Sequence, residues 1–377
     1  MDNQKHLTFC PAKWDELFVN LNYNFVYSCC TSTPIRFVDK ADIATILNGQ
    51  KDNLLNGVQD NSCEYCWRVE RQGHPSKRHT YLKDFNFDSI EKYKDNPKPQ
   101  RVELNLGNEC NFQCTYCNPK FSSQWATDVK NKSYKIFSDK DFYSYEDKQD
   151  VNITDTIDWL KNYTQVKTLS VLGGEPLQNK NLFKVLDEIP CEVLTFNTNL
   201  SCKTFDPIDR IIKIAPKYKT MRISISLDST GANAEFSRFG LDYELIIRNI
   251  NYILEQAPDN VQLVIASVMT SFTIRDLTVF ADQVKIFKLK RPDLLWNLVP
   301  CQEPKILSLN TLPDQFKSDI LVLLEKLKDE DWIIGLAPLV SVLQVSKFNN
   351  TLYSQMKHFL EEFSSRKGIK IPVDLNL

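Results

Sequence analysis

Long apolar runs, a charge imbalance and low-complexity segments are all missing from this chain of 377 residues. No run is long enough to span a bilayer, and residues 1–9 lack the charged-then-apolar pattern of a secretion signal, so we expect a cytoplasmic protein with no membrane partner. Lys and Arg number 46 against 48 Asp and Glu, so the charge balance indicates no nucleic-acid partner. A hydrophobic content of 42% is enough for one sizeable domain with smaller appendages.

Cysteine, in contrast, is plentiful, with eleven residues in the chain. Thiols in a reducing compartment stay free to bind soft metals, so this number favours metal ligation over disulfides. Cys110, Cys114 and Cys117 form a C-x3-C-x2-C triplet directly after a strand-like run at 101–106. Because four ligands saturate an iron-sulfur cluster, a triplet with no fourth cysteine nearby leaves one iron open to a small molecule. The triplet therefore predicts an iron-sulfur site that serves catalysis.

The middle of the chain alternates strand-like and helix-like segments, which is typical of βα units around a mostly parallel sheet. Residues 243–256 place apolar side chains at three- and four-residue steps and so predict a helix with one apolar face. We predict an α/β fold, namely a partial (β/α)6 barrel of the TIM type. The expected strands, each rich in Val, Ile, Leu or Phe, are 102–106, 168–172, 192–196, 221–227, 261–269 and 294–299.

The sequence pattern changes along the chain and predicts three domains. Residues 1–97 are cysteine-bearing and turn-rich, and they end at a natural boundary in the Pro-containing stretch 95–99. Residues 98–305 hold the βα units, and residues 306–377 form a helical extension with expected helices at 312–329 and 340–363. Within the barrel, the polar stretch 118–152 is too long for an ordinary loop and is interpreted as a lid or insertion.

Polar residues follow the expected strands at their carboxyl ends, where the working groups of parallel βα barrels lie. Gly173-Gly174-Glu175-Pro176 follows the second strand, and the two glycines let backbone groups approach a ligand closely because they lack a Cβ. Asn197 and Asn199 follow the third strand, and Ser226 and Asp228 the fourth. We expect these side chains to contact a ligand, although the two asparagines could instead cap a helix or fix a turn.

The cysteine triplet, followed one βα unit later by a Gly-Gly-Glu-Pro loop, resembles the radical S-adenosylmethionine superfamily over residues 99–304. The resemblance implies that Cys110, Cys114 and Cys117 bind a [4Fe-4S] cluster, and that the amino and carboxyl groups of S-adenosylmethionine chelate its fourth iron. It also implies reductive cleavage of S-adenosylmethionine, with an electron from a reductant such as flavodoxin or ferredoxin. The products are methionine and a 5′-deoxyadenosyl radical, which abstracts hydrogen from the substrate.

The same resemblance assigns cofactor-binding residues but no catalytic side chain. It implies that the methionyl amine is held by the loop at Gly173, Gly174 and Glu175, and that the adenine lies near Tyr116. The path of the ribose and carboxylate is then lined by polar side chains at the ends of the next two strands, namely Asn197, Asn199, Ser226 and Asp228.

A second group of cysteines lies in the first 97 residues: Cys10, Cys29, Cys30, Cys63 and Cys66. Cys63 and Cys66 form a C-x2-C turn, and Cys10 with either Cys29 or Cys30 would complete a closed four-thiolate site. The arrangement resembles the N-terminal twitch domain of one group of radical S-adenosylmethionine proteins, which implies an auxiliary [4Fe-4S] cluster. A structural zinc ion held by four cysteines is the alternative, because it uses the same C-x2-C turn.

The sequence leaves three functions open. The first is a radical enzyme acting on a peptide, protein or other bulky substrate, because twitch-type clusters accompany such chemistry in related families. The second is a binding or scaffold protein stabilised by zinc or an iron-sulfur cluster, and the third is a radical enzyme acting on a nucleotide or nucleic acid. The Gly-Gly-Glu-Pro loop favours an enzyme, since a scaffold has no use for a cradle for the cofactor amine.

Overall fold

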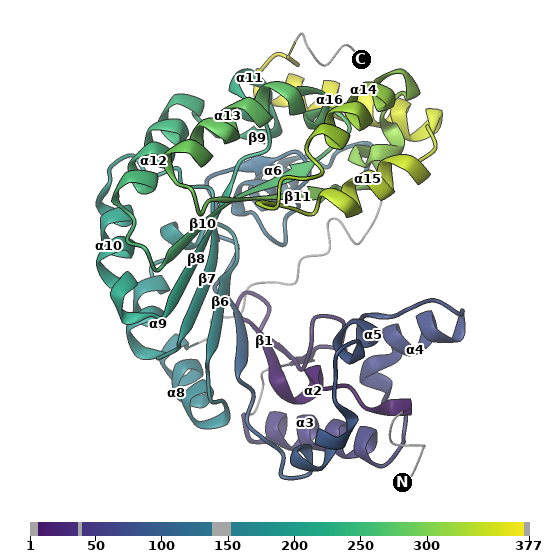
Figure 1. Ribbon diagram of the computed structural model, residues 1–377, viewed down its shortest axis with the longest axis vertical. Coiled ribbons are helices and arrows are strands. Elements are labelled where there is room, and N and C mark those ends of the chain that lie inside the picture. The colour runs from purple at the N-terminus through teal and green to yellow at the C-terminus, as the bar shows by residue number, and fades with distance from the viewer. Residues whose placement is uncertain (1–6, 37–39, 138–151, 373–377) are drawn as a thin grey trace. The chain divides into compact units, whose positions relative to one another are not determined.

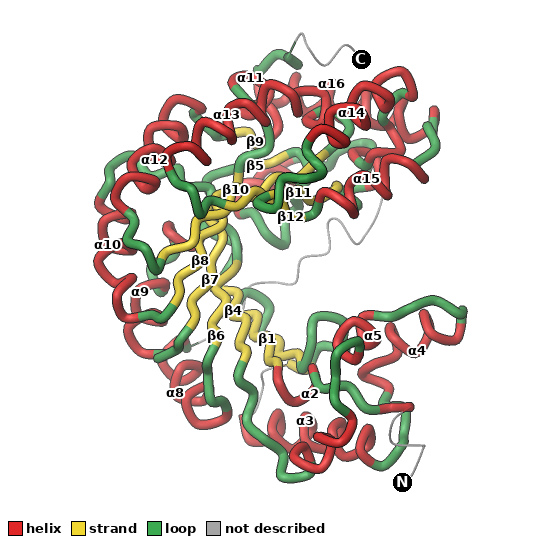
Figure 2. The backbone as a smooth tube through the Cα atoms, viewed as in Figure 1, coloured by secondary structure: helices red, strands yellow, loops and turns green. Residues whose placement is uncertain are grey.

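A computed structural model describes residues 7–36, 40–137 and 152–372, which belong to two compact units. The first unit comprises residues 1–107, 146–173 and 179–195, and the second comprises residues 108–145, 174–178 and 196–377, in each case within the described ranges. Figure 1 labels the elements along the chain, and Figure 2 distinguishes its helices, strands and loops. The domain limits at 97 and 305 stay predictions.

The first unit is built on strands in the order β6-β4-β1-β2-β3. Strands β1, β4 and β6 are parallel, with Leu17 opposite Val102 and Val102 opposite Leu169, while β2 and β3 add an antiparallel edge. The first 97 residues therefore contribute a strand, β1, that pairs directly with the first expected strand of the barrel. The bounds are β1 (Glu16–Asn20), β2 (Phe25–Tyr27), β3 (Ile35–Arg36), β4 (Arg101–Asn105) and β6 (Thr168–Leu172).

Helices and an aromatic core complete the first unit. Its helices are α2 (Ala12–Asp15), α3 (Lys40–Leu55), α4 (Glu64–Arg71), α5 (Lys77–Leu82), α8 (Ile153–Tyr163) and α9 (Leu182–Glu188). Phe9, Trp14, Trp67 and Tyr93 belong to one buried cluster, in which the Phe9 and Trp14 ring centroids lie 5.2 Å apart. Because Phe9 precedes Cys10 and Trp67 follows Cys66, burial of these rings fixes the backbone beside two cysteines of the N-terminal group.

Strand β7 (Val193–Thr198) begins in the first unit and ends in the second, where parallel strands follow in the order β12-β11-β10-β8. Ile223 on β8 lies opposite Leu263 on β10, and both are buried. Helices α10 (Asp206–Ile214), α12 (Tyr243–Gln256) and α13 (Leu277–Lys290) lie along one side of these strands (Figure 1). The strand bounds are β8 (Thr220–Ser226), β10 (Val261–Met269), β11 (Leu295–Pro300) and β12 (Ile333–Ile334).

The predicted α/β class with mostly parallel strands is confirmed. The six expected strands correspond to β4, β6, β7, β8, β10 and β11, with bounds that differ by at most two residues. The expected helix at 243–256 coincides with α12, whose buried face includes Ile246, Ile250 and Ile253. The Asp242 side chain accepts a hydrogen bond from the Leu245 amide at 3.0 Å, which satisfies one of the free donors at the start of α12.

The C-terminal region departs from the prediction in one respect. The helix expected at 312–329 is α14 (Asp314–Lys326), but the single helix expected at 340–363 is wrong, because two helices lie there, α15 (Leu336–Val345) and α16 (Asn350–Lys367). The Asn349 side chain accepts a hydrogen bond from the Leu352 amide at 3.0 Å, and this cap starts a new helix. Within the described ranges, no helix has both the length and the apolar character that crossing a membrane requires.

Candidate active site

The cysteine triplet lies on a short loop of the second unit that a small antiparallel sheet holds in place. Cys114 is on β5 (Gln113–Cys114), which pairs with β9 (Arg238–Phe239) so that Cys114 is opposite Arg238. The Cys117 amide donates to the Cys114 carbonyl at 2.9 Å, which closes the turn between these two cysteines. The Ser123 hydroxyl donates to the Cys110 carbonyl and accepts from its amide, both at 3.1 Å, so three separate contacts fix the loop.

Burial dominates the electrostatics of the three thiols. Desolvation raises the pKa of Cys110 to about 12 and that of Cys114 to about 11, and it also raises the pKa of Cys117. Within residues 7–36, 40–137 and 152–372, no three Cys, His, Asp or Glu side chains converge on a point where one metal ion could bind. Thiolates of an iron-sulfur cluster bind separate irons, so they need not meet at one point.

The Gly-Gly-Glu-Pro loop packs against the backbone that precedes the triplet. A Cβ on Gly174, which has φ +46°, would lie 2.1 Å from the Glu109 carbonyl oxygen, and the Glu175 amide donates to that same oxygen at 2.7 Å. A Cβ on Gly173, with φ +102°, would lie 2.2 Å from the Asn105 side-chain oxygen. Only glycine permits both the backbone conformation and the close approach at these positions.

The Glu175 carboxylate is buried and joins this loop to the end of β7. It accepts hydrogen bonds from the Thr198 hydroxyl at 2.6 Å, from the Leu177 amide at 3.1 Å and from the Asn199 amide. Burial raises the pKa of Glu175 to about 7, although these hydrogen bonds oppose the shift. In this arrangement, the carboxylate positions the end of β7 beside the loop.

Asn199 connects the end of β7 to the cysteine loop. Its side-chain amide donates to the Asn111 side-chain oxygen at 2.9 Å, and Asn111 directly follows Cys110. Its own side-chain oxygen accepts from the Ser201 hydroxyl at 2.7 Å. Asn197, the other asparagine of the predicted site, is exposed, and Ser226 is partly buried at the last position of β8.

Asp228 is fully buried and forms a tight ion pair with Arg238, a residue that the sequence did not single out. Nε of Arg238 lies 2.9 Å from one carboxylate oxygen and Nη2 lies 2.9 Å from the other. The Tyr116 hydroxyl also donates to Asp228, at 2.7 Å, as does the Val268 amide at 2.8 Å. With the Ser237 hydroxyl at 3.5 Å, five donors surround this carboxylate, so in this arrangement Asp228 orients Tyr116 and Arg238.

Arg238 brings a positive charge to the cysteine loop. Its Nη1 atom lies 3.9 Å from the Cys114 sulfur, and its guanidinium lies over the Tyr116 ring at 5.5 Å from the centroid. Cys114 and Arg238 are 124 positions apart, so no spacing rule links them in the sequence. In the sequence, the only sign of the ion pair is that Arg238 lies ten positions after Asp228, which follows a strand. Such an arrangement is too common to identify a site.

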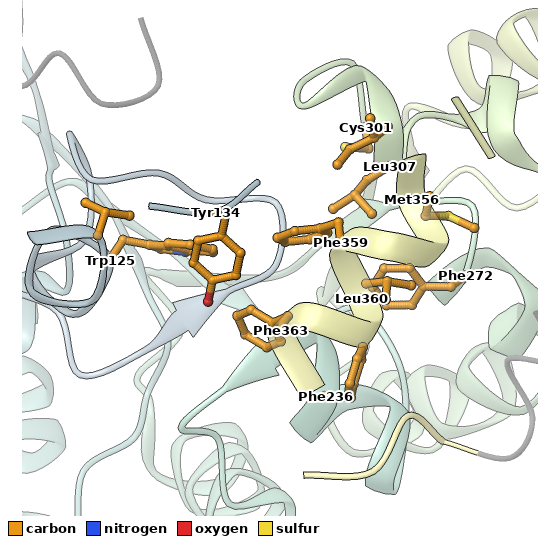
Figure 3. Packing of buried hydrophobic residues seen from close by; sticks show 12 residues of the cluster. Trp125, Tyr134, Phe236, Phe272, Cys301, Leu307, Met356, Phe359, Leu360 and Phe363 are labelled. Carbon is orange, nitrogen blue, oxygen red and sulfur yellow. The ribbon is translucent and has the colours of Figure 1, made fainter. Parts of the chain in front are cut away.

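A hydrophobic cluster borders the cysteine loop, and its rim includes Tyr116 and Cys117. Trp125 of α6 (Ser123–Asn131) donates its indole N–H to the Cys114 carbonyl at 2.8 Å. Figure 3 shows Trp125 and Tyr134 facing Phe359 and Phe363 of α16. The predicted insertion at 118–152 thus contributes residues of this cluster through its described part, while its residues 138–151 lie outside the described ranges.

The N-terminal cysteines lie in the first unit, where four of them line one pocket: Cys10, Cys29, Cys63 and Cys66. Cys30 does not line this pocket and is exposed. The Thr31 hydroxyl is 3.6 Å from the Cys29 sulfur and 3.7 Å from the Cys66 sulfur. Of the two candidates for the fourth thiol, the geometry therefore brings Cys29 to the other three.

Residues 104–282 match the model of the Radical SAM superfamily, so the chain contains a domain of this superfamily, whose members use a [4Fe-4S] cluster and S-adenosylmethionine. Two GTP 3′,8-cyclases of Staphylococcus epidermidis are each 26% identical over 90 residues, which is 23% of this chain and 22% of theirs. The match thus spans about a fifth of the length of these curated relatives.

Similar solved structures include Streptococcus suis SuiB bound to S-adenosylmethionine, with a TM-score of 0.42 and 16% identity, covering 83% of this chain and 68% of that one. TYW1 with a lysine-pyruvate adduct has a TM-score of 0.37 and 15% identity, covering 67% of this chain and 80% of that one.

Proposed function

We propose that this radical S-adenosylmethionine protein cleaves its cofactor reductively and abstracts hydrogen from a peptide, protein or other bulky substrate, with the help of a second iron-sulfur cluster. The contact that carries the proposal is the one between the Gly-Gly-Glu-Pro loop and Glu109. It holds Gly174 and Glu175 against the backbone that leads into Cys110. Two motifs more than fifty positions apart are thereby joined into one site, as binding of a cofactor by both would require.

The residues present fit an anionic cluster that carries S-adenosylmethionine. Three thiols come from one fixed loop, and a buried guanidinium lies beside one of them. Cys110, Cys114 and Cys117 would hold the cluster. A bound cluster would supply one electron for breaking the carbon-sulfur bond of the cofactor, which would give methionine and a 5′-deoxyadenosyl radical able to take a hydrogen atom from the substrate.

The chain's own residues bind and shield the reactants. Gly173 and Gly174 let the loop pack against Asn105 and Glu109, and their partly buried backbone groups would hold the methionyl end of the cofactor. Arg238 stabilises negative charge on the Cys114 sulfur, and hydrogen bonds to cluster sulfurs are one determinant of reduction potential. The cluster of Trp125 and the α16 aromatics excludes water from the side of Tyr116 and Cys117, which protects a radical from side reactions.

For the first unit, we propose that Cys10, Cys29, Cys63 and Cys66 bind the auxiliary [4Fe-4S] cluster. All four thiols line the same pocket, as four ligands of a closed cluster must. Zinc is the alternative occupant of four thiolates. Metal analysis of anaerobically purified protein separates the two: about eight irons per chain support two four-iron clusters, whereas about four irons and one zinc contradict the auxiliary cluster.

The proposed peptide or protein substrate rests on the resemblance of the N-terminal cysteines to the twitch domain. A nucleotide is the second candidate, and the 90-residue similarity to GTP 3′,8-cyclase favours it. Deuterium transfer distinguishes them. Cells are grown with either deuterated amino acids or deuterated nucleosides, S-adenosylmethionine is removed from each extract, and the purified enzyme is incubated with the extract and unlabelled S-adenosylmethionine. Deuterium in 5′-deoxyadenosine from the amino-acid-labelled extract alone supports a peptide or protein, whereas deuterium from the nucleoside-labelled extract alone contradicts it.

The test of the reaction itself is product formation. Reduced protein supplied with S-adenosylmethionine and either dithionite or a flavodoxin system should release 5′-deoxyadenosine and methionine in equal amounts. Absence of both products from protein that contains its full iron complement would contradict the proposed reaction. A colourless protein that holds zinc and no iron would instead support the scaffold alternative.

A further inference from the structure

Lys13 presents a buried positive charge beside the four-thiol pocket. Its side chain is 2% exposed, and its ammonium donates to the Ser28 hydroxyl at 2.5 Å, the Ser62 hydroxyl at 2.8 Å and the Gln50 side-chain oxygen at 2.9 Å. All three acceptors are neutral, and they come from three separate segments of the first unit. The ammonium therefore has its full set of hydrogen bonds while its charge stays unmatched by them.

No carboxylate of the described residues forms an ion pair with Lys13. The Ser62 hydroxyl bridges Lys13 and the Asp60 carboxylate, to which it donates, and the two charges also attract each other through space without a direct contact. Burying a cation without a directly paired anion is unfavourable, and proteins usually avoid it unless another charge is brought in. The arrangement therefore indicates an anion that joins Lys13 when a ligand is bound.

The thiol pocket is where that anion would lie. Lys13 lines the pocket together with the four cysteines, and the Ser62 hydroxyl that binds Lys13 is 4.0 Å from the Cys63 sulfur. Arg78 also lines the pocket, but Glu70 already matches its charge through two contacts, Nε at 3.0 Å and Nη2 at 2.7 Å. Among the described residues that line this pocket, Lys13 is thus the buried cation that has no direct ion pair.

We propose that Lys13 is the counter-charge of the metal-thiolate cluster in this pocket, an inference that rests on the proposed auxiliary cluster. Four thiolates around a four-iron core leave a net charge of about −2, and reduction adds one more negative charge. A fixed ammonium nearby stabilises this anion and favours its reduction. In the metal-free protein the same ammonium is unfavourable, so Lys13 acts in opposite directions in the two states.

The test uses full-length protein in which Cys110, Cys114 and Cys117 are all replaced by Ala, so that only the first-unit site holds metal. In this background, Lys13→Met removes the charge at similar length, and Lys13→Gln serves as a second, polar neutral variant. We expect both to lose iron to the chelator bathophenanthroline about tenfold faster, as for other residues that support metal ligands. We also expect a more negative midpoint potential by EPR-monitored titration and a higher melting temperature of the metal-free protein.

Lys51→Met is the matched control. Lys51 is also buried, 3% exposed, and its ammonium donates to the Asn96 side-chain oxygen at 2.8 Å, but it does not line the pocket. Burial, together with the charge of Lys13, lowers the pKa of Lys51 to about 8. Its replacement should raise the melting temperature of the metal-free protein and leave iron loss and midpoint potential unchanged.

Iron loss and midpoint potential that are the same with and without the Lys13 charge would overturn the inference. So would a background protein that retains no metal, although cleavage of S-adenosylmethionine by the parent enzyme would then still support the radical reaction. Zinc in the pocket, lost faster from both Lys13 variants than from the Lys51 variant, would support the role of Lys13 and contradict only the iron-sulfur assignment.

Discussion

Each unit holds a group of cysteines beside a buried cation, and the two groups differ in how that cation is neutralised. In the second unit, Arg238 lies beside Cys114 but forms a two-point ion pair with the buried Asp228. In the first unit, Lys13 contacts three neutral oxygens and no described carboxylate. The charge of Arg238 is therefore matched within the protein, whereas the role proposed for Lys13 assigns its counter-charge to a metal cluster in the four-thiol pocket.

The two cysteine groups also differ in their number of thiols. Four thiolates close a cluster against further ligands, whereas three leave one iron for a substrate or cofactor. A preformed charge network suits the open site, because catalysis needs its groups in place before the reactant arrives. The proposed four-thiol cluster would have no reactant to position, so it would serve as a structural element.

The largest effect should come from removing the triplet. Replacing Cys110, Cys114 and Cys117 with Ala should reduce 5′-deoxyadenosine formation to background, because no iron remains to bind the cofactor, and should remove about half of the iron. Product is measured by mass spectrometry and iron by a colorimetric assay. The reciprocal variant, with Ala at Cys10, Cys29, Cys63 and Cys66, should lose the other half. Cofactor cleavage that persists in the first variant would contradict the assignment of the cofactor-binding cluster to the triplet.

Arg238→Met should show that the second-unit cation is structurally paired. The change leaves the Asp228 carboxylate buried without its counter-charge, which should lower the free energy of unfolding by about 3–5 kcal/mol in a urea titration of metal-free protein. Lys13→Met is expected to have the opposite sign in the same assay. A change of unfolding free energy in the same direction for both variants would contradict the difference in charge pairing between Arg238 and Lys13.

Gly174→Ala should reveal how tightly the cofactor loop is packed at the open site. The new Cβ would lie 2.1 Å from the Glu109 carbonyl oxygen, in addition to the strain of φ +46°. We expect a loss of about 3 kcal/mol in unfolding free energy and weaker S-adenosylmethionine binding by calorimetry.

Gly231→Ala is the control for this change, because Gly231 has φ +47° with no heavy atom within 4 Å of the added Cβ. It should cost only the backbone strain, about 1 kcal/mol. Equal losses for the two variants would mean that the contact with Glu109 is loose.

Glu175 gives the open site a pH dependence of stability. Its pKa in the folded protein, about 7, is raised above the ordinary value of 4.5, so the stabilisation is present below pH 4.5 and is lost as the pH rises through 7. Unfolding free energies of the parent should fall between pH 4.5 and 7 by on the order of 2–3 kcal/mol relative to Glu175→Gln, which cannot titrate. Parallel curves for the two proteins would refute the shift.

The smallest effect is expected from Cys30. Because Cys30 is exposed and outside the pocket, Cys30→Ala should retain the iron content of the parent, whereas Cys29→Ala should lose iron from the first unit. Iron analysis of the two purified variants is sufficient. The reverse result would exchange the roles of these neighbouring cysteines.

The features that the sequence could reveal are those carried by local spacing. Alternating apolar segments located β4, β6, β7, β8, β10 and β11, and fixed intervals located both cysteine groups. The separation of Cys29 from Cys30 could not be predicted, since only the direction of each side chain in the fold distinguishes adjacent thiols. The break between α15 and α16 depends on the Asn349 cap, a signal that is present in the sequence but weaker than the apolar pattern around it.

The residues that complete both sites could not be predicted for a related reason. Arg238 meets Cys114 across 124 positions, and Lys13 meets Ser62 across 49. Such contacts follow from strand pairing and core packing, which bring together residues that no motif connects. The polar residues at strand ends could be named, but the partners of Asp228 and Glu175 required the fold.

One measurement tests directly whether only the triplet leaves an iron open to the cofactor. Electron-nuclear double resonance on reduced protein with ¹⁵N- and ¹⁷O-labelled S-adenosylmethionine reports whether the amine and carboxylate bind iron. The account predicts both couplings in the variant with Ala at Cys10, Cys29, Cys63 and Cys66, and none in the variant with Ala at Cys110, Cys114 and Cys117. Couplings that are absent from the first variant or present in the second would contradict it.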